Sequence, residues 1–141
     1  GDRQNLTIIT NNLRLPPVTP ESCLRSIHIL GGAYWPVSQV TIGPVGFPDV
    51  PGISADTAVI GATGLSASGV SMGRLEEASE TAAMIRIASR TIALLDHSKF
   101  NLTAFARVAA FSQITFLITD AWPPDNIVAA IKKAGTQLIV C

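Results

Sequence analysis

Six short apolar runs, rich in β-branched residues, constrain the fold of this 141-residue chain more than any other feature. They occupy residues 6–10, 26–30, 57–62, 91–95, 115–119 and 136–140. Apolar runs without polar alternation are typical of strands buried on both faces, as in a parallel sheet. A hydrophobic content of 48% is enough for a substantial core. We therefore predict a folded α/β domain built on these six strands.

Helical periodicity separates several of these runs. The first pattern places apolar or small residues at steps of three and four, namely Leu75, Ala78, Ala82, Ile85 and Ser89. This spacing predicts an amphipathic helix of about four turns. Glu76, Glu77 and Glu80 stand near its start, where the helix dipole favours anions, and we expect them on a solvated face.

A second helix is predicted from the stretch "PPDNIVAAIKKAG", residues 123–135. Pro124 and Asp125 suit a first turn, and Gly135 suits the end of a helix. The residues that share one face are Ile127, Ala130, Ile131 and Ala134. Strands that alternate with helices predict right-handed crossovers, and so a mostly parallel sheet flanked by helices.

Two regions depart from this alternation. Three prolines in residues 13–22 exclude a regular helix over most of that stretch. Residues 31–54 are rich in glycine and proline and predict a loop that carries Tyr34, Trp35 and Phe47. These aromatic side chains could cover a pocket, meet another subunit or pack on their own domain.

Composition excludes several classes of protein. The formal net charge is zero with 14% charged residues, so no basic surface for nucleic acid or an anionic membrane is expected. The apolar runs are far shorter than the roughly 20 residues needed to span a bilayer. The first ten residues do not resemble a secretory signal, which predicts a cytoplasmic location.

Metal and cofactor motifs are missing from the sequence. Cys23 and Cys141 lack metal-ligand spacing and are interpreted as free thiols. The glycines after the third run, Gly61 and Gly64, do not complete a dinucleotide-binding fingerprint, and there is no phosphate loop of the GK[ST] type. We predict neither a cofactor nor a metal ion.

Polar residues follow the first four runs, where parallel strands would end at one edge of the sheet. They include Asn11, Gly32, Gly61, Thr63, Gly64, Asp96 and Lys99. Exposed backbone amides at glycines, amide and hydroxyl side chains and one lysine suit an anionic, hydroxylated ligand. The pattern predicts a binding site for a small phosphorylated sugar or polyol.

Catalysis is not expected at this edge. His97 stands between Asp96 and Ser98, but neighbours on one turn rarely align as nucleophile, base and orienting acid. The other histidine, His28, lies inside an apolar run and is predicted to be a core residue. We assign no catalytic residue.

Five blocks of the sequence resemble the C-terminal sensor domain of DeoR-family bacterial transcriptional regulators. They are "LTIITNN", "HILGGAY", "ADTAVIGATGLSASGVSMGRLEEASETAAMI", "LLDHSKFNLTAFARVA" and "ITFLITD", and the resemblance covers residues 6–140. It implies a fold similar to ribose-5-phosphate isomerase and the coenzyme A transferases. It also implies a phosphorylated sugar effector, a homo-oligomer, and DNA binding only through an N-terminal winged helix-turn-helix outside this chain.

The resemblance also implies roles for individual residues. Asn11 would lie near the ligand, Gly32 would form the cleft floor, Gly61, Thr63 and Gly64 would line the loop after the third strand, Glu77 would approach from the helix start, Asp96 would hold the turn, and Lys99 would bind the phosphate. Phe100 would pack beneath the turn. Arg107 would be either a second phosphate contact or a subunit-interface residue.

Two departures from the family pattern shape the functional expectation. The glycine- and threonine-rich loop after the family's first sensor strand is missing, so we expect a chain truncated at its N-terminus, a single sensor-domain fragment over residues 1–141. Thr63, Gly64 and Ser66 stand where the isomerase relatives carry acidic residues, and they cannot serve as a general base at neutral pH. Binding without catalysis is expected. The alternatives are a sugar-phosphate isomerase-like enzyme and a pure oligomerisation module.

Overall fold

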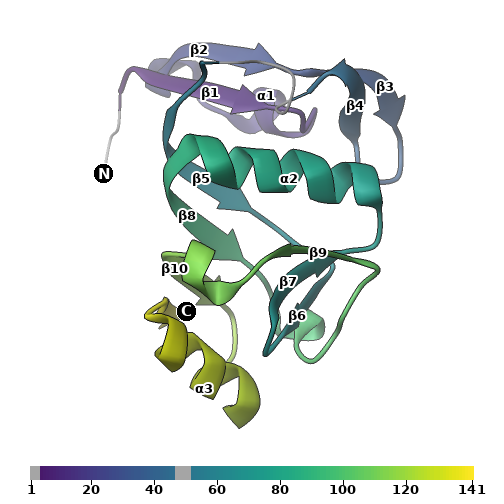
Figure 1. Ribbon diagram of the computed structural model, residues 1–141. Coiled ribbons are helices and arrows are strands. Elements are labelled where there is room, and N and C mark those ends of the chain that lie inside the picture. Colours follow the sequence, from purple (N-terminus) through teal and green to yellow (C-terminus); the bar gives the residue numbers. More distant parts are fainter. Residues whose placement is uncertain (1–3, 47–51) are drawn as a thin grey trace. The chain divides into compact units, whose positions relative to one another are not determined.

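The computed structural model describes residues 4–46 and 52–141 (Figure 1). The chain divides into two compact units, Gly1–Pro51 and Gly52–Cys141. Each unit has its own sheets. Among the described residues, no helix combines the length and the apolar character that crossing a membrane requires.

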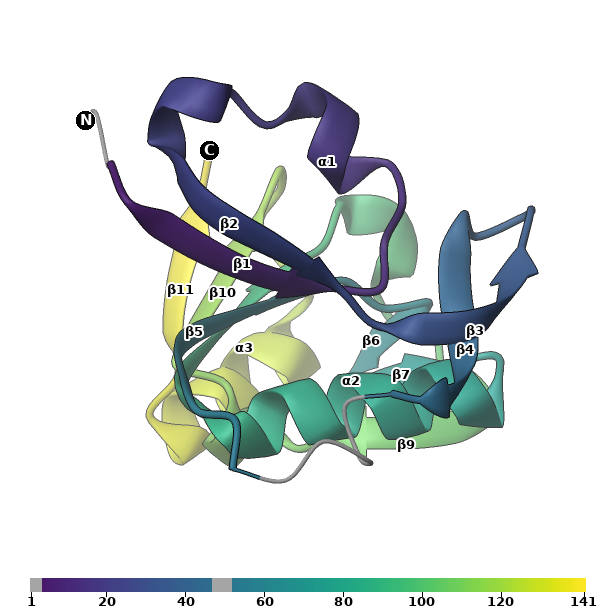
Figure 2. The same cartoon turned by 90° about the horizontal axis from the view of Figure 1, so that it is seen from above.

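The first unit begins with two parallel strands, β1 (Leu6–Thr10) and β2 (Leu24–Ile29), which lie side by side in Figure 2. Their connection holds a four-residue helix, α1 (Leu15–Val18), and a 3-10 helix, Glu21–Cys23. The prolines of α1 stand in its first turn, where a missing N–H is tolerated. Both predicted strands are therefore confirmed, as is the mostly irregular connection.

The predicted loop over residues 31–54 is wrong in its first half. Strands β3 (Gly31–Trp35) and β4 (Val40–Val45) pair in antiparallel fashion, with Tyr34 opposite Thr41 and Trp35 opposite Val40. Aromatic and β-branched residues in cross-strand pairs stabilise a hairpin despite nearby glycines and prolines. Tyr34 is exposed and Trp35 half-buried, while Phe47 lies outside the described residues.

The prediction for His28 is also wrong. Its side chain is exposed on β2, and a ring nitrogen lies 3.3 Å from the hydroxyl of Ser26. Neighbouring Ile29 is 52% exposed as well. An apolar run therefore does not imply burial of every residue within it.

The second unit contains a four-stranded parallel sheet in the order β11-β10-β8-β5. Its strands are β5 (Ala55–Ile60), β8 (Ala88–Leu94), β10 (Phe116–Thr119) and β11 (Gln137–Val140). They coincide with the last four predicted runs to within a few residues. The predicted α/β class with a mostly parallel sheet is confirmed.

Two helices, α2 (Leu75–Ile87) and α3 (Asp125–Ala134), pack on one face of this sheet. The hydrophobic core between these helices and the sheet includes Ala58, Ile60, Ile85, Ala93, Leu117, Ile127 and Ile131. Gly135 ends α3 with a left-handed φ of 79°, and Ile127 and Ile131 are buried, as the sequence predicts. The packing of these two helices on the sheet fixes the positions of the strand ends.

Helix α2 differs from its prediction in two respects. It ends at Ile87, so Ser89 belongs to β8. Glu80 is buried rather than solvated, with 6% of its surface exposed. The helix contacts both the four-stranded sheet and strands β7 and β9, so more than one of its faces is covered.

The opposite face of the four-stranded sheet is apolar and partly open in the described residues. Val59, Leu94 and Ile139 are 51%, 46% and 42% exposed. Both helices of the second unit cover the other face.

A second, antiparallel sheet was not predicted. It consists of β6 (Gly64–Ser66), β7 (Gly69–Met72) and β9 (Ala106–Ala109), in the order β6-β7-β9 (Figure 1). Leu65 and Val70 are completely buried in it. The residues "GATGLSASG" are therefore mostly a short hairpin rather than an open strand-end loop.

Candidate functional site

Three neighbouring strands of the second unit end at one edge of its parallel sheet. Gly61 follows β5, Asp96 lies two residues beyond β8, and Asp120 follows β10. Because β8 pairs in parallel with both β5 and β10, these ends lie on the same side of the sheet. The predicted convergence is confirmed for this unit, and strand-end edges are where α/β folds bind ligands.

The turn after β8 is organised by Asp96. Residues His97–Lys99 form a 3-10 helix, and the Asp96 carboxylate accepts the backbone N–H of Ser98 at 2.9 Å. The N–H of Lys99 donates to the carbonyl oxygen of Asp96 at 3.1 Å. Hydrogen bonds from Ser98, followed by the charge of Lys99, lower the pKa of Asp96 below its usual 3.8. Asp96 thus holds the turn that carries Lys99, while a contact between Asp96 and a ligand stays a prediction.

Lys99 is supported from below by the core. Its side chain is half-buried, and Phe100 packs against the hydrophobic cluster. Phe100 also forms a β-bridge with Leu65, which is fully buried. The predicted packing of Phe100 is confirmed, so the lysine is presented from a turn anchored on the protein interior.

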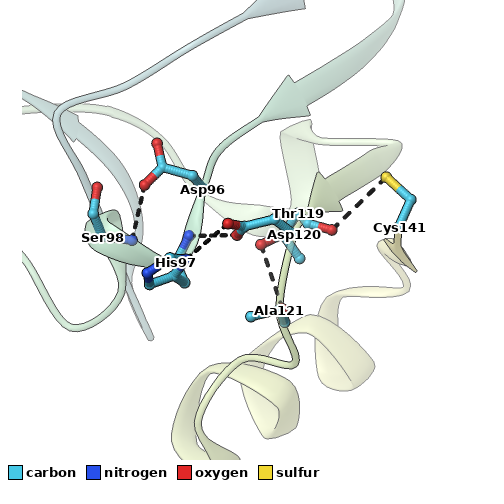
Figure 3. A network of polar contacts seen from close by, with 7 residues as sticks. All are labelled: Asp96, His97, Ser98, Thr119, Asp120, Ala121 and Cys141. Carbon is cyan, nitrogen blue, oxygen red and sulfur yellow. Dashed lines mark hydrogen bonds and ion pairs between the residues drawn. The ribbon is translucent and has the colours of Figure 1, made fainter.

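Asp120 is a residue of this edge that the sequence interpretation missed. One carboxylate oxygen accepts the backbone N–H of His97 at 2.7 Å, and the other lies 2.7 Å from Nδ1 of the same imidazole. Figure 3 shows the imidazole directed toward Asp120 from the neighbouring strand end. The signal that could have identified it is a carboxylate directly after an apolar strand, in "FLITD".

The contact with Asp120 changes the pKa of His97. The hydrogen bond and the charge of Asp120 raise the pKa of His97 above its ordinary 6.5, and His97 in turn lowers the pKa of Asp120. The stability that this pairing contributes is therefore complete below about pH 6.5 and is lost as the pH rises through the raised pKa of His97. An NMR titration of the two histidines should place His97 above 6.5. In Asp120→Asn the value should fall toward 6.5, and an unchanged value would contradict the contact.

The loop after β5 contains three predicted site residues. Gly61 is exposed. The Thr63 N–H donates to Ser71 O at 3.0 Å, and its hydroxyl accepts the Gly73 N–H at 3.4 Å. Gly64 is buried in β6, where a Cβ would collide with the carbonyl group of Leu102. Packing alone therefore requires glycine at position 64, and ligand contacts from these three residues stay predictions.

The remaining predicted residues lie on other elements. Glu77 is half-buried on α2, and Arg107 is exposed on β9. Asn11 and Gly32 belong to the first unit, where the Asn11 side chain donates to Thr41 O at 3.2 Å and Gly32 lies in β3. Their placement beside Lys99 stays a prediction.

A separate concavity of about 420 Å³ lies at the opposite edge of the parallel sheet. Its polar lining includes Arg86, Ser89, Arg90, Ser112 and Thr115, near the starts of β8 and β10. It shares no residue with the Asp96–Lys99 turn. This concavity is thus a competing location for an anion and must be distinguished by experiment.

The part of the chain that the structure describes contains no set of metal-ligating side chains. No group of three or more histidine, cysteine, aspartate or glutamate side chains there is arranged to hold a metal ion. Cys23 and Cys141 are free thiols, in agreement with the sequence interpretation.

Comparisons with known proteins identify the family. The family model of the DeoR C-terminal sensor domain matches residues 1–121. The HTH-type transcriptional repressor GlcR of Bacillus subtilis is 31% identical over 134 residues, which cover 95% of this chain and 52% of that protein. The transcriptional repressor AccR of Agrobacterium fabrum is 27% identical, over 99% of this chain and 55% of its own length.

A third relative is the glycerol-3-phosphate regulon repressor of Haemophilus influenzae, which is 28% identical over 98% of this chain and 54% of its own length. The chain thus spans about half the length of the curated relatives it matches. The resemblance read from the sequence blocks is confirmed. The chain belongs to the family of DeoR C-terminal sensor domains.

Proposed function

We propose that this chain is the effector-binding sensor domain of a transcriptional repressor, and that the turn after β8 binds the phosphate of a sugar or polyol effector. The observation that carries the proposal is the Lys99 turn itself. It stands at the carboxyl edge of a parallel sheet, is capped by Asp96 and is anchored on the core through Phe100. A lysine ammonium in such a position is a compact partner for a phosphate group.

The relatives support this function. GlcR and AccR are transcriptional repressors, and one further relative is named for the glycerol-3-phosphate regulon, whose namesake is a phosphorylated polyol. We propose that DNA is bound through a separate N-terminal domain, because this chain is neutral and has few charged residues. A cytoplasmic homo-oligomer is the corresponding proposal for the whole protein.

The hydroxyl groups of the effector require further contacts. We propose that Gly61, Thr63, Gly64 and Glu77 supply them, and that Asn11 and Gly32 are also effector contacts. The relatives are repressors and Thr63 is no general base, so we propose binding without turnover.

A thermal-shift panel on the intact protein tests the proposal. The panel contains glycerol 3-phosphate, ribose 5-phosphate, hexose 6-phosphates and the unphosphorylated counterpart of each. We expect stabilisation by one phosphorylated compound only. At a concentration about 100-fold above its Kd, the ligand should add about 2.7 kcal/mol to the free energy of unfolding.

Variants of two lysines locate the binding. Lys99→Ala should weaken effector binding about 10- to 100-fold, because a hydrogen bond to a charged group contributes roughly 1.5–3 kcal/mol. Lys132→Ala, an exposed lysine in the last turn of α3, is the matched control and should bind normally. No shift with any compound would refute effector binding, and turnover of ribose 5-phosphate would favour the isomerase-like alternative.

A further inference from the structure

The loop between β8 and β9 is fastened at two places, once to the residue that follows β10 and once to the first turn of α3. Asp120 holds His97 through the backbone N–H and the imidazole, each at 2.7 Å (Figure 3). Asn126 donates its side-chain N–H to Oδ1 of Asn101 at 3.0 Å. Lys99 lies between these two fastened positions. The backbone that presents its side chain is therefore held on both sides.

The fastening at Asp120 connects the exposed turn to the rigid centre of the sheet. Asp120 directly follows β10, whose Leu117 is completely buried and whose backbone pairs with β8 and β11. Its carboxylate therefore starts from a fixed position. By accepting from both the backbone and the ring of His97, it restricts the whole turn and not only one side chain. A site held in its binding geometry loses less conformational freedom when the ligand arrives.

The strength of this contact depends on the charge of His97. The charges that raise the pKa of His97 belong to Asp120 and, less strongly, to Asp96, while Lys99 acts on Asp96. The lowered pKa of Asp120 keeps its carboxylate ionised at neutral pH. An imidazolium forms a charge-assisted bond to that carboxylate, and a neutral imidazole forms a weaker one in a single tautomer.

We propose that Asp120 is a positioning residue of the effector site, which acts through His97 to fix the turn that presents Lys99 and makes effector affinity depend on the protonation of His97. This inference rests on the proposed function. His97 is 67% exposed at its side chain, so it exchanges protons freely with solvent. The Asn101–Asn126 contact has no titratable group and supplies a tether of the same loop that does not respond to pH.

The experiment is a calorimetric titration of the intact protein with glycerol 3-phosphate, ribose 5-phosphate and the hexose 6-phosphates at pH 6.0 and pH 8.5. The second ionisation of a phosphate ester occurs near pH 6, so affinities at the two pH values are not directly comparable. The ratio of the variant's Kd to that of the wild type, taken at each pH, removes this effect. We expect Asp120→Asn to raise Kd about three- to tenfold at pH 6.0 and less than twofold at pH 8.5.

Three further variants separate positioning from a general structural role. His97→Asn keeps a hydrogen-bond donor near the position of Nδ1 but cannot carry the charge of an imidazolium. It should therefore reproduce the pH-dependent loss of effector affinity expected for Asp120→Asn. Asn126→Ala removes the uncharged tether and should raise Kd by the same factor at both pH values. Asp56→Asn removes an exposed carboxylate at the amino-terminal end of β5 and should behave as the wild type.

The outcomes distinguish this inference from the proposed function. If Lys99→Ala weakens binding as expected while Asp120→Asn gives a ratio of one, the site stands and the positioning role is wrong. If Asp120→Asn gives the same raised ratio at both pH values, the dependence of affinity on the protonation of His97 is wrong. If the wild-type protein binds none of these compounds, the proposed function fails and this inference fails with it. A ratio that is large at pH 6.0 and small at pH 8.5 supports both.

Discussion

Replacing Gly69 with alanine is expected to lower the free energy of unfolding of the second unit by about 3 kcal/mol or more, the sum of backbone strain and overpacking. Gly69 begins β7 with φ at 111°, a conformation that residues with a side chain rarely adopt. Its added Cβ would collide with the carbonyl oxygen of Ala109 and lie 2.9 Å from Cα of Ala110. Both neighbours are backbone atoms, so β7 and β9 would have to separate.

Gly73→Ala is the matched control for this substitution. Gly73 follows β7, and a Cβ at that position meets no atom within 4 Å. Denaturant unfolding monitored by circular dichroism should show a large loss of unfolding free energy for Gly69→Ala. For Gly73→Ala the free energy of unfolding should change by no more than about 0.5 kcal/mol, as is usual at open surface positions. Equal stability of the two variants would show that the β7–β9 pairing is not as described.

Leu117→Ala is expected to destabilise the second unit by about 2–5 kcal/mol, through lost burial and the cavity that remains. Leu117 is completely buried on β10, between β8 and β11, and packs in the same cluster as Ile127 and Ile131 of α3. A residue enclosed by sheet and helix leaves a cavity that its neighbours cannot easily fill.

Leu94→Ala provides the comparison for this cavity. Leu94 ends β8 on the other face of the same sheet and is 46% exposed. Leu94→Ala removes the same atoms as Leu117→Ala, but about half of the Leu94 side chain already contacts water. The loss of unfolding free energy should therefore be well below that of Leu117→Ala. Both variants can be measured by denaturant unfolding. A larger loss for Leu94→Ala would mean that the two faces of the sheet have been assigned the wrong way round.

The strongly patterned elements could be predicted from the sequence. Strand β1 matches its predicted run at both ends, and α3 has the predicted buried isoleucines and the predicted glycine at its end. In these segments the local preference, the apolar pattern and the tertiary burial agree. The identity of the family could also be read from the sequence blocks.

The elements that were missed depend on contacts distant in sequence. Strands β6, β7 and β9 have three or four residues each, too few for a periodic signal, and β9 pairs with β7 across the whole of α2 and β8. Glu80 is buried because α2 contacts β7 and β9 as well as the parallel sheet. Neither the second sheet nor this burial is encoded in a local pattern.

The candidate site was only partly predictable for the same reason. The turn formed by Asp96 and Ser98 is local and follows from sequence neighbours. The contact between Asp120 and His97 joins residues 23 positions apart, and it exists because β8 and β10 are adjacent in the sheet. The contributions proposed for Asn11 and Gly32 involve the first unit and remain predictions.

The most direct test of the central claim is an NMR titration of the intact, isotope-labelled protein with glycerol 3-phosphate, in the wild type and in Lys99→Ala. A phosphate bound at the turn after β8 should shift the backbone amides of residues 96–101, and these shifts should vanish in the variant. Perturbations confined to the concavity around Arg86, Arg90 and Ser112, or undiminished in Lys99→Ala, would contradict the proposed site.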